Sequence, residues 1–310
     1  MASKWEEFYA KHVPPEDLKQ SESLLQKFVE RHSNENCKVA LVTSGGTTVP
    51  LEHNTVRFVD NFSAGTRGAI SAEYFLENGY AVIFMYRTKS LEPFARHFTG
   101  NKILDMLMEK DESTITVVPE HTGQVAEVLK KYKRAMNKGR LLQLTFTTLI
   151  EYLWLLRSAC QMLAYLNDKT ILYLAAAVSD FYIPSNEMSV HKIPSSGPPS
   201  ISLQLVPKIL EPLVSLWVPK AFVISFKLET DATILIKKCT EALNKYKHNI
   251  VVGNILQTRK QRVTIVSKNG NYEIKLTDKQ LEKGEEIEKD IVAFLVEEHE
   301  KFMHCRQTLR

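Results

Sequence analysis

Cysteines are few in this chain and lie far apart. The four of them form no CxxC pair, and a chain of 310 residues does not need disulfides to build a core: Cys37, Cys160, Cys239, Cys305. We expect four free thiols in a reducing compartment. The expected location is the cytoplasm, and the sequence leaves nuclear entry open.

Long apolar runs are also missing. No run approaches the ~20 residues that span a bilayer, and the first twenty residues lack the apolar stretch of a secretory signal. Lys and Arg number 40 against 36 Asp and Glu, so the net charge of +4 is small and is spread along the chain. Surfaces that bind nucleic acid usually concentrate their charge. The sequence therefore predicts neither a membrane nor a nucleic-acid partner.

Two common nucleotide signatures are absent. There is no GxxxxGK[ST], and no GxGxxG follows the first expected strand, which excludes a P-loop and an ordinary dinucleotide fold. His299 and His304 are five residues apart, about 140° round a helix from each other, so they cannot face one metal. We expect both on a solvated helix face, and we predict no metal ligands among the side chains.

Apolar, β-rich runs alternate with longer helical patterns through most of the chain. The runs at 38–45, 81–87, 171–181, 221–227 and 249–255 show no period-2 alternation, which is typical of strands buried on both faces. Helices are expected at 122–136 and 149–166. The predicted fold class is α/β, with a Rossmann-like, mostly parallel sheet and helices on both faces.

The two ends of the chain differ from this middle. Residues 1–36 are predicted to form an N-terminal helical cap, with one amphipathic helix over 15–36 that lies before the core rather than in it. Residues 37–310 are predicted to form one Rossmann-like domain. Within it, Asn269-Gly270 indicates an antiparallel hairpin at about 263–276, and a final amphipathic helix follows. The proline- and serine-rich stretch 184–200 is expected to be a long loop.

Glycine or polar residues follow four of the expected strands. Gly45 and Gly46, in a Ser-Gly-Gly-Thr run, would let a phosphate approach the backbone, although strand-to-helix geometry alone could require them. Another of the expected strands ends in three small residues, Ala175–Ala177, before Asp180. The Asp180 carboxylate could bind ribose or a metal, or it could simply cap a turn. The segment 225–231 and Asn254 end two further strands. We interpret this edge as a ligand site.

Seven motifs in this order resemble one family. They are VTSGGT, VPLE, VRFVDNFSAGTRGA, YLAAAVSDFY, HKI, FVISFKLETD and VVGNIL. Together they resemble the phosphopantothenoylcysteine synthetase family in its single-function eukaryotic form, over nearly the whole chain beyond Asn36. The resemblance implies a phosphopantothenate–cysteine ligase that joins 4'-phosphopantothenate and L-cysteine through an acyl-nucleotide, in coenzyme A biosynthesis. It further implies ATP, with CTP as the alternative co-substrate, together with Mg²⁺, and a homodimer.

The resemblance also assigns roles to residues. Asn61 would donate to the carbonyl oxygen during the reaction, Arg57 would reach the substrate of the neighbouring subunit, and Lys192 would close over the reactive groups as a flap lysine. Asn254 would contact substrate. The nucleotide would bind Gly45, Gly46, Ala176, Ala177, Asp180, Phe226, Lys227 and Leu228. The chain has HKIPSS where many bacterial members have KIKK, so the second positive charge of that flap is missing.

Two other classes compete with the ligase. An NADP-dependent, short-chain-type reductase would contain the YxxxK spacing seen from Tyr165 to Lys169, but the TGxxxGxG loop is missing. A non-catalytic nucleotide-binding regulator would keep the fold without turnover. The intact Asn61, Arg57 and Asp180 argue against the regulator, as does Lys192.

Overall fold

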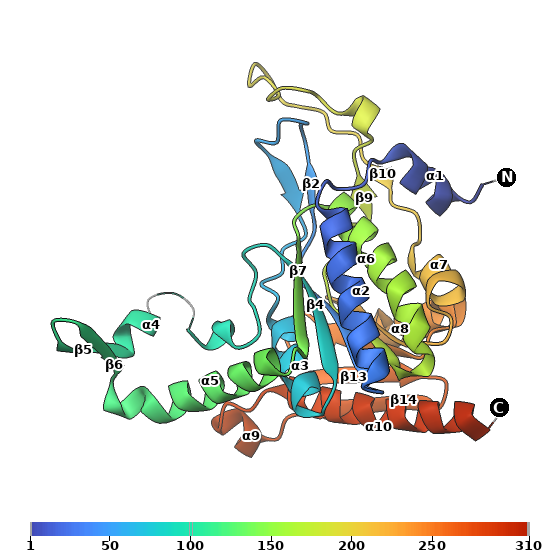
Figure 1. Ribbon diagram of the computed structural model, residues 1–310. Helices are drawn as coiled ribbons and strands as arrows, with labels where there is room; N and C mark the ends of the chain where they lie inside the picture. Colours follow the sequence, from blue (N-terminus) through green and yellow to red (C-terminus); the bar gives the residue numbers. More distant parts are fainter. Residues whose placement is uncertain (1, 99, 101, 309–310) are drawn as a thin grey trace.

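The computed structural model describes residues 2–98, 100 and 102–308. An eight-stranded sheet with the order β14-β13-β12-β11-β8-β1-β4-β7 forms its centre (Figure 1). Six neighbouring strands are parallel: β1 Val39–Ser44, β4 Ala81–Arg87, β7 Leu141–Phe146, β8 Thr170–Leu174, β11 Phe222–Glu229 and β12 Ile250–Ile255. The predicted Rossmann-like, mostly parallel α/β sheet is confirmed.

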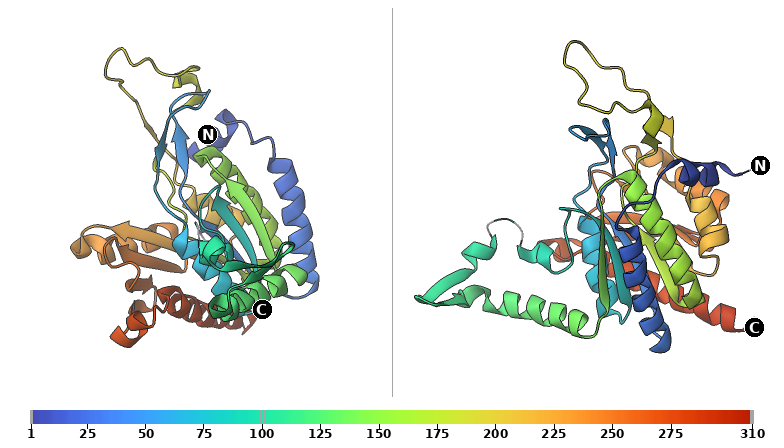
Figure 2. Two further views of the ribbon diagram at one scale, coloured as in Figure 1. Left: turned by 90° about the vertical axis from the view of Figure 1, so that its left-hand side faces the viewer. Right: turned by 45° about the horizontal axis from the view of Figure 1, so that its top comes forward.

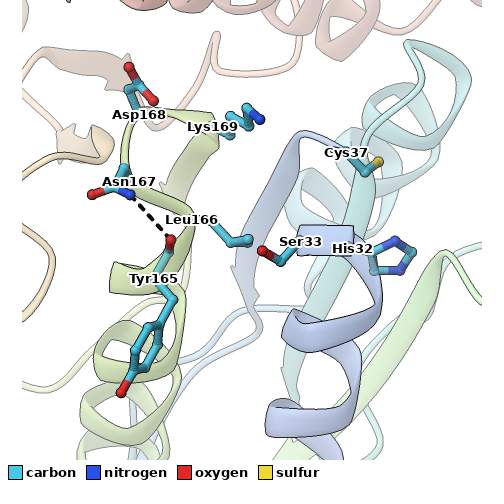
Figure 3. Close-up of a pocket in the computed structure, with 8 residues that line it drawn as sticks. All are labelled: His32, Ser33, Cys37, Tyr165, Leu166, Asn167, Asp168 and Lys169. Carbon is cyan, nitrogen blue, oxygen red and sulfur yellow. Dashed lines mark hydrogen bonds between the residues drawn. The ribbon is translucent and has the colours of Figure 1, made fainter. Parts of the chain in front are cut away.

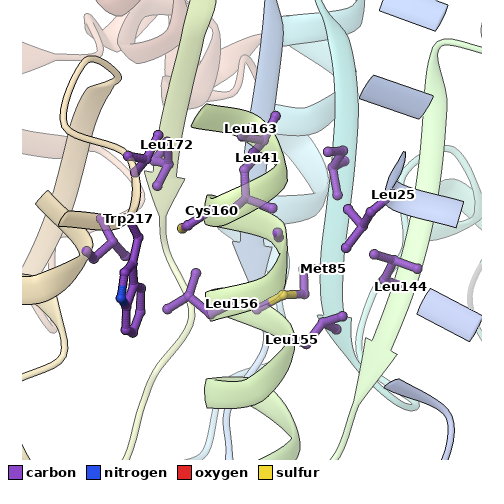
Figure 4. Packing of buried hydrophobic residues seen from close by; sticks show 14 of the residues in the cluster. Leu25, Leu41, Met85, Leu144, Leu155, Leu156, Cys160, Leu163, Leu172 and Trp217 are labelled. Carbon is purple, nitrogen blue, oxygen red and sulfur yellow. The ribbon is translucent and has the colours of Figure 1, made fainter. Parts of the chain in front are cut away.

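Successive side chains of these strands enter two different cores. In β1, Val39 and Leu41 pack on one side, and Ala40 and Val42 pack on the other. The first core lies under α2 (Leu18–Asn34) and α6 (Leu149–Leu163); Figure 4 shows α6 running across it. The second lies under α3 (Thr66–Glu77) and α10 (Ile287–Thr308). Because both faces are covered, these strands show no regular alternation of apolar and polar side chains.

Helix α2 is part of the first core. Leu25 is fully buried there, and Phe28 and Val29 are buried beside it. The expectation that this helix lies before the core rather than in it is therefore wrong: its apolar stripe covers β7 and packs along α6. The proposed boundary between residues 36 and 37 stays a prediction. A shorter helix, α1 (Lys4–Lys11), precedes α2 and was not expected separately.

The predicted hairpin is present. It consists of β13 (Arg262–Ser267) and β14 (Gly270–Lys275), and it extends the main sheet because β13 pairs antiparallel with β12. The final helix is also confirmed, with Ile287, Ile291 and Leu295 buried. His299 on this helix contradicts our expectation, since its side chain is fully buried, whereas His304 is exposed.

The remaining elements surround this sheet. Helices α5 and α6 confirm the two helices expected after residue 122, and α8 packs over β11, β12 and β13. Two segments project from the body, an arm over 102–137 and a loop over 183–203 beside β2 and β3 (Figure 2). The bounds are β2 Thr48–Pro50, β3 Phe58–Asp60, η1 Ala95–Phe98, α4 Lys102–Asp105, β5 Leu107–Asp111, β6 Thr114–Val117, η2 Pro119–His121, α5 Thr122–Asn137, η3 Ala164–Lys169, β9 Phe181–Tyr182, η4 Ser185–Glu187, β10 Gln204–Leu205, α7 Leu210–Pro212, η5 Leu213–Trp217, α8 Ala232–Tyr246 and α9 Asp278–Glu282.

Candidate active site

The order of the parallel strands reverses between β1 and β8. From β1 the sheet continues through β4 to β7, whereas from β8 it continues in the other direction through β11 to β12. Loops that leave two such strands diverge, which opens a crevice at their carboxyl ends, the usual place for a ligand in open α/β sheets. The glycine loop and the small-residue strand end predicted from the sequence both lie at this point.

Backbone hydrogen bonds join these two segments. The Ala177 N–H donates to the Gly45 carbonyl at 2.8 Å, and the Thr47 N–H donates to the Ala177 carbonyl at 3.0 Å. The Thr43 hydroxyl accepts from the Ala176 N–H at 3.1 Å. Gly45, Gly46, Ala176 and Ala177 therefore form one continuous floor.

The backbone conformation at Gly45 and the packing at Gly46 both require glycine. Gly45 has a φ of +81°, a backbone conformation that residues other than glycine rarely adopt. A Cβ on Gly46 would lie 1.7 Å from the Asn61 carbonyl oxygen, so the backbone of Asn61 occupies the space of a side chain. The Asn61 N–H also donates to the Thr47 carbonyl at 3.1 Å. The backbone of Asn61 thus lies against the floor, and the role of its side chain toward the reacting carbonyl stays a prediction.

Glu52 is a buried carboxylate to which the sequence analysis gave no role. It lies in the VPLE motif, its side chain is completely buried, and it accepts the Arg57 Nε at 3.1 Å. It also accepts the N–H groups of Arg57 at 3.0 Å, Val56 at 3.3 Å and Ile193 at 3.4 Å. Burial alone would raise the pKa of Glu52, but these N–H groups and the Arg57 charge together hold that pKa below its ordinary value.

Arg57 links this carboxylate to the long loop. Its Nη2 donates to the Ile193 carbonyl at 2.6 Å. The same loop is attached at two further points, where the N–H groups of His53 and Asn54 donate to the carbonyls of Ser189 at 2.9 Å and Val190 at 3.1 Å. Its path beside the β2–β3 hairpin is therefore fixed over residues 189–193.

Lys192 lies between two of these attachments, and its side chain is exposed. Asp180 directly precedes β9, the strand from which the loop leaves. Its side chain is also exposed, and its carboxylate lies 3.3 Å from Lys208 Nζ. Asp180 lies six residues after the end of β8, whereas Lys192 lies on the projecting loop. Their assigned roles stay predictions.

The segment of β11 that is predicted to bind nucleotide lies one strand further along the sheet. Phe226 packs edge-on against Tyr173 with 4.8 Å between ring centroids, whereas Lys227 and Leu228 are exposed. Asn254 on β12 is buried, and its Nδ2 donates to the Lys227 carbonyl at 3.2 Å. These four residues are brought together at the carboxyl ends of adjacent strands, as predicted.

Arg67 is a second residue to which the sequence analysis gave no role. From the first turn of α3 its Nη2 donates to Asn254 Oδ1 at 3.2 Å, and its Nη1 is 3.0 Å from Glu288. Burial raises the pKa of Glu288, and the charge of Arg67 opposes that rise. The position of Arg67 after the Gly65 turn, inside a family motif, is the signal that would have identified it. The side-chain amide of Asn254 is therefore held by protein groups on both of its atoms.

Among the described residues, one cavity lies at the amino ends of the sheet's strands and another at their carboxyl ends. One of about 160 Å³ is at the amino end of β8, lined by His32, Cys37 and residues 165–169 (Figure 3). It contains none of the predicted site residues. It does contain Tyr165 and Lys169 of the YxxxK pattern, which are thus at the end of the sheet away from the β1–β8 crevice. The other cavity, of about 440 Å³, lies at the carboxyl ends of β4 and β7 and includes Thr147, which accepts from the Thr48 N–H beside the floor.

Within residues 2–98, 100 and 102–308, no three His, Cys, Asp or Glu side chains are grouped so as to hold a metal ion. In the same part of the chain, the helices are all too short or too polar to cross a bilayer.

Comparison with known proteins gives one consistent answer. Residues 155–298 match the family described as the DNA/pantothenate metabolism flavoprotein C-terminal domain. Phosphopantothenate–cysteine ligase of Homo sapiens is 45% identical over 289 residues, which cover 91% of this chain and 93% of that protein. Phosphopantothenate–cysteine ligase CAB2 of Saccharomyces cerevisiae is 41% identical over 308 residues, which cover 91% of this chain and 82% of the relative.

The fold agrees with the sequence matches. A solved structure of a Cab2 mutant in complex with phosphopantothenate-cysteine superposes with a TM-score of 0.90 at 39% identity, and the match covers 97% of this chain and 99% of that one. The resemblance drawn from the seven motifs is thereby confirmed. The chain belongs to the phosphopantothenate–cysteine ligase family.

Proposed function

We propose that this chain joins 4'-phosphopantothenate to L-cysteine to give 4'-phosphopantothenoylcysteine, in coenzyme A biosynthesis. The observation that carries the proposal is the floor at the β1–β8 crevice, where Gly45, Ala177 and Asn61 are fixed together by backbone contacts. Further support comes from the names of the human and yeast relatives and from the product-like molecule in the Cab2 complex.

The chemistry requires activation of a carboxylate. An amine does not displace a carboxylate oxygen until that oxygen becomes part of a good leaving group. A carboxylate oxygen of phosphopantothenate would attack the α-phosphorus of the nucleotide, and pyrophosphate would leave. The cysteine nitrogen would then attack the carbonyl carbon, lose a proton, and expel the nucleoside monophosphate together with that oxygen. The acyl-nucleotide between these two steps is part of the proposal.

The floor has properties that suit these steps. The small side chains of Ala176 and Ala177 leave the backbone open to a ligand, and Asp180 follows them at the strand end. Asn61 carries an amide that would donate to the carbonyl oxygen as negative charge develops on it, which is the kind of interaction that accelerates acyl transfer most. The nucleotide would extend from Gly45 and Gly46 toward residues 226–228.

Charged groups complete the proposed site. Lys192, exposed on its loop, would neutralise charge near the reacting carbonyl, and Arg57 would reach the substrate of the second subunit in a homodimer. The nucleotide would be ATP rather than CTP. It would carry Mg²⁺, which would be bound mainly through the phosphate oxygens of the nucleotide. Asn254 would contact substrate. The buried thiols of Cys37, Cys160 and Cys239 accord with a cytoplasmic location.

A single assay tests the function. Purified protein is incubated with phosphopantothenate, cysteine, Mg²⁺ and either ATP or CTP, while pyrophosphate and product mass are measured. The proposal predicts pyrophosphate release that requires phosphopantothenate, formation of the cysteine amide, and a higher kcat/KM with ATP. Oxidation of NADPH without nucleotide turnover would instead support the reductase. Nucleotide binding with neither activity would support the regulator.

A further inference from the structure

Helix α1 is fixed to the body by aromatic side chains. Phe8 and Tyr9 are buried, and the Tyr9 hydroxyl donates to the Leu153 carbonyl of α6 at 2.8 Å. Trp5 packs edge-on against Trp217 with 5.6 Å between centroids. The guanidinium of Arg157 on α6 adds cation–π contacts to this cluster, at 4.8 Å from the Tyr9 ring. The position of α1 is thus set by α6 and η5.

The other side of α1 touches the base of the long loop. The ring of Phe8 meets the ring of Tyr182 edge-on, with 5.0 Å between centroids, and His12 lies 5.4 Å from the same ring. The His12 ring is itself held to the Phe8 carbonyl, 2.7 Å from its Nδ1. Figure 1 shows α1 beside β9 and β10, the two strands between which the loop leaves and returns.

The base of the loop, formed by β9 and β10, contains few backbone hydrogen bonds of its own. The ladder of β9 and β10 has two pairs, Tyr182 with Gln204 and Phe181 with Leu205, and one further bond joins the Val206 N–H to the Asp180 carbonyl at 2.9 Å. A two-stranded ladder of this length is marginally stable by itself. Contacts from outside the ladder must therefore contribute to the direction in which the loop leaves the body.

We propose that Phe8 and Tyr182 are positioning residues, through which helix α1 sets the direction in which the 183–203 loop leaves its base and, together with the attachments of residues 189–193 to the 52–57 segment, helps to place Lys192. The activity part of this inference rests on the function proposed above, whereas the geometric part does not. An edge-to-face aromatic pair is worth an energy equivalent to roughly a two- to tenfold change in an equilibrium constant. We expect effects of that size on the loop.

A double-mutant cycle tests the pair. The wild type, Phe8→Ala, Tyr182→Ala and the double variant are treated briefly with trypsin in the native state without substrates, and cleavage between Lys192 and Ile193 is measured by mass spectrometry. Each single variant is expected to increase the cleavage rate about two- to tenfold. The double variant is expected to resemble the more affected single variant, because both remove the same contact. Unchanged cleavage, or effects that multiply, would overturn the proposal.

A matched control separates positioning from loss of stability. Tyr9→Phe removes the hydrogen bond to Leu153 at the next position of the same helix but keeps the contact between Phe8 and Tyr182. It is expected to lower Tm and to leave cleavage at Lys192 at the wild-type rate. If it increased cleavage as much as Phe8→Ala, general loosening would explain both results and the proposal would fail.

Steady-state kinetics test the effect on activity separately from the effect on cleavage. Phe8→Ala is expected to lower kcat two- to tenfold with a smaller change in the KM for ATP, and Phe8→Trp should restore part of the loss. If the wild type did not ligate, the proposed function would fail while the cleavage cycle still decided the geometric claim. If the wild type ligated and kcat of Phe8→Ala were unchanged, the claim about Lys192 would be wrong.

Discussion

The carboxylate of Glu52 is completely buried, whereas its ion-pair partner Arg57, 3.1 Å away, keeps 38% of its side chain exposed. The buried partner also accepts three backbone N–H groups, one of them from Ile193, which lies 141 residues further along the chain. This relationship makes one side chain responsible for the shape of the 51–57 segment and for the attachment of the loop next to Lys192.

Replacement of Glu52 by glutamine should therefore affect both stability and catalysis. The amide group would face at least one N–H donor, so we expect the free energy of unfolding to fall by about 1–3 kcal/mol. We expect kcat/KM to fall roughly tenfold, equivalent to about 1.4 kcal/mol, because the loop loses one attachment. Urea denaturation and steady-state kinetics provide the measurements. Glu273→Gln, which breaks the exposed pair with Arg262, is the control and should change stability by less than about 1 kcal/mol.

The proposed role of Arg57 in the second subunit can be tested by complementation. Arg57→Ala and Asn61→Ala subunits are each expected to be almost inactive. After subunit exchange, one of the two sites in each hybrid dimer would contain both intact residues, so part of the activity should return. Activity that stayed at the level of the parents after verified exchange would place Arg57 in the site of its own subunit.

His299 predicts a dependence of stability on pH. Its Nε2–H donates to the Asp168 carbonyl at 2.8 Å, so its Nδ1 accepts from the Tyr80 hydroxyl at 2.8 Å. Burial lowers the pKa of His299 to about 4. In the unfolded chain the pKa of this histidine is near 6.5, so the unfolded state binds the proton more readily than the folded state does. This contribution to stability is complete above pH 6.5 and is lost as the pH falls toward 4.

Comparison of pH 7.5 with pH 5 measures that contribution. Between these values His299 should account for about 2 kcal/mol of the loss in unfolding free energy. His299→Gln cannot titrate, so its stability should fall by that much less between the two pH values, even though it starts lower. Equal losses in the wild type and the variant would show that His299 is protonated in the folded state.

Asn61 allows the two chemical steps to be separated. If its amide mainly stabilises the oxyanion formed when cysteine attacks, Asn61→Asp should still release pyrophosphate once per site and accumulate the acyl-nucleotide, because a carboxylate repels that oxyanion. Ligation should fall by about 10² to 10³. Rapid quench and mass spectrometry detect the intermediate. A folded, dimeric variant that neither releases pyrophosphate nor traps it would assign Asn61 to activation or binding.

The sequence predicted those features that depend on neighbouring residues. Apolar runs without alternation identified buried parallel strands, and glycines after β1 and alanines after β8 marked the crevice because both directly follow their strands. Glu52 received no role, since its partner Ile193 is distant in sequence and nothing local shows that the two meet. His299 was placed in solvent because its helical face alone does not reveal Tyr80 and Asp168. Helix α1 is only eight residues long, and its aromatic contacts come from α6, η5 and β9.

An isotope experiment tests the central claim most directly. Phosphopantothenate labelled with ¹⁸O in both carboxylate oxygens is ligated to cysteine with unlabelled ATP, and the phosphorus-containing products are examined by mass spectrometry. Activation through an acyl-adenylate predicts one ¹⁸O atom in AMP and none in pyrophosphate. Recovery of the label in inorganic phosphate, with ADP as the nucleotide product, would show that the carboxylate is activated by phosphorylation and would contradict the account.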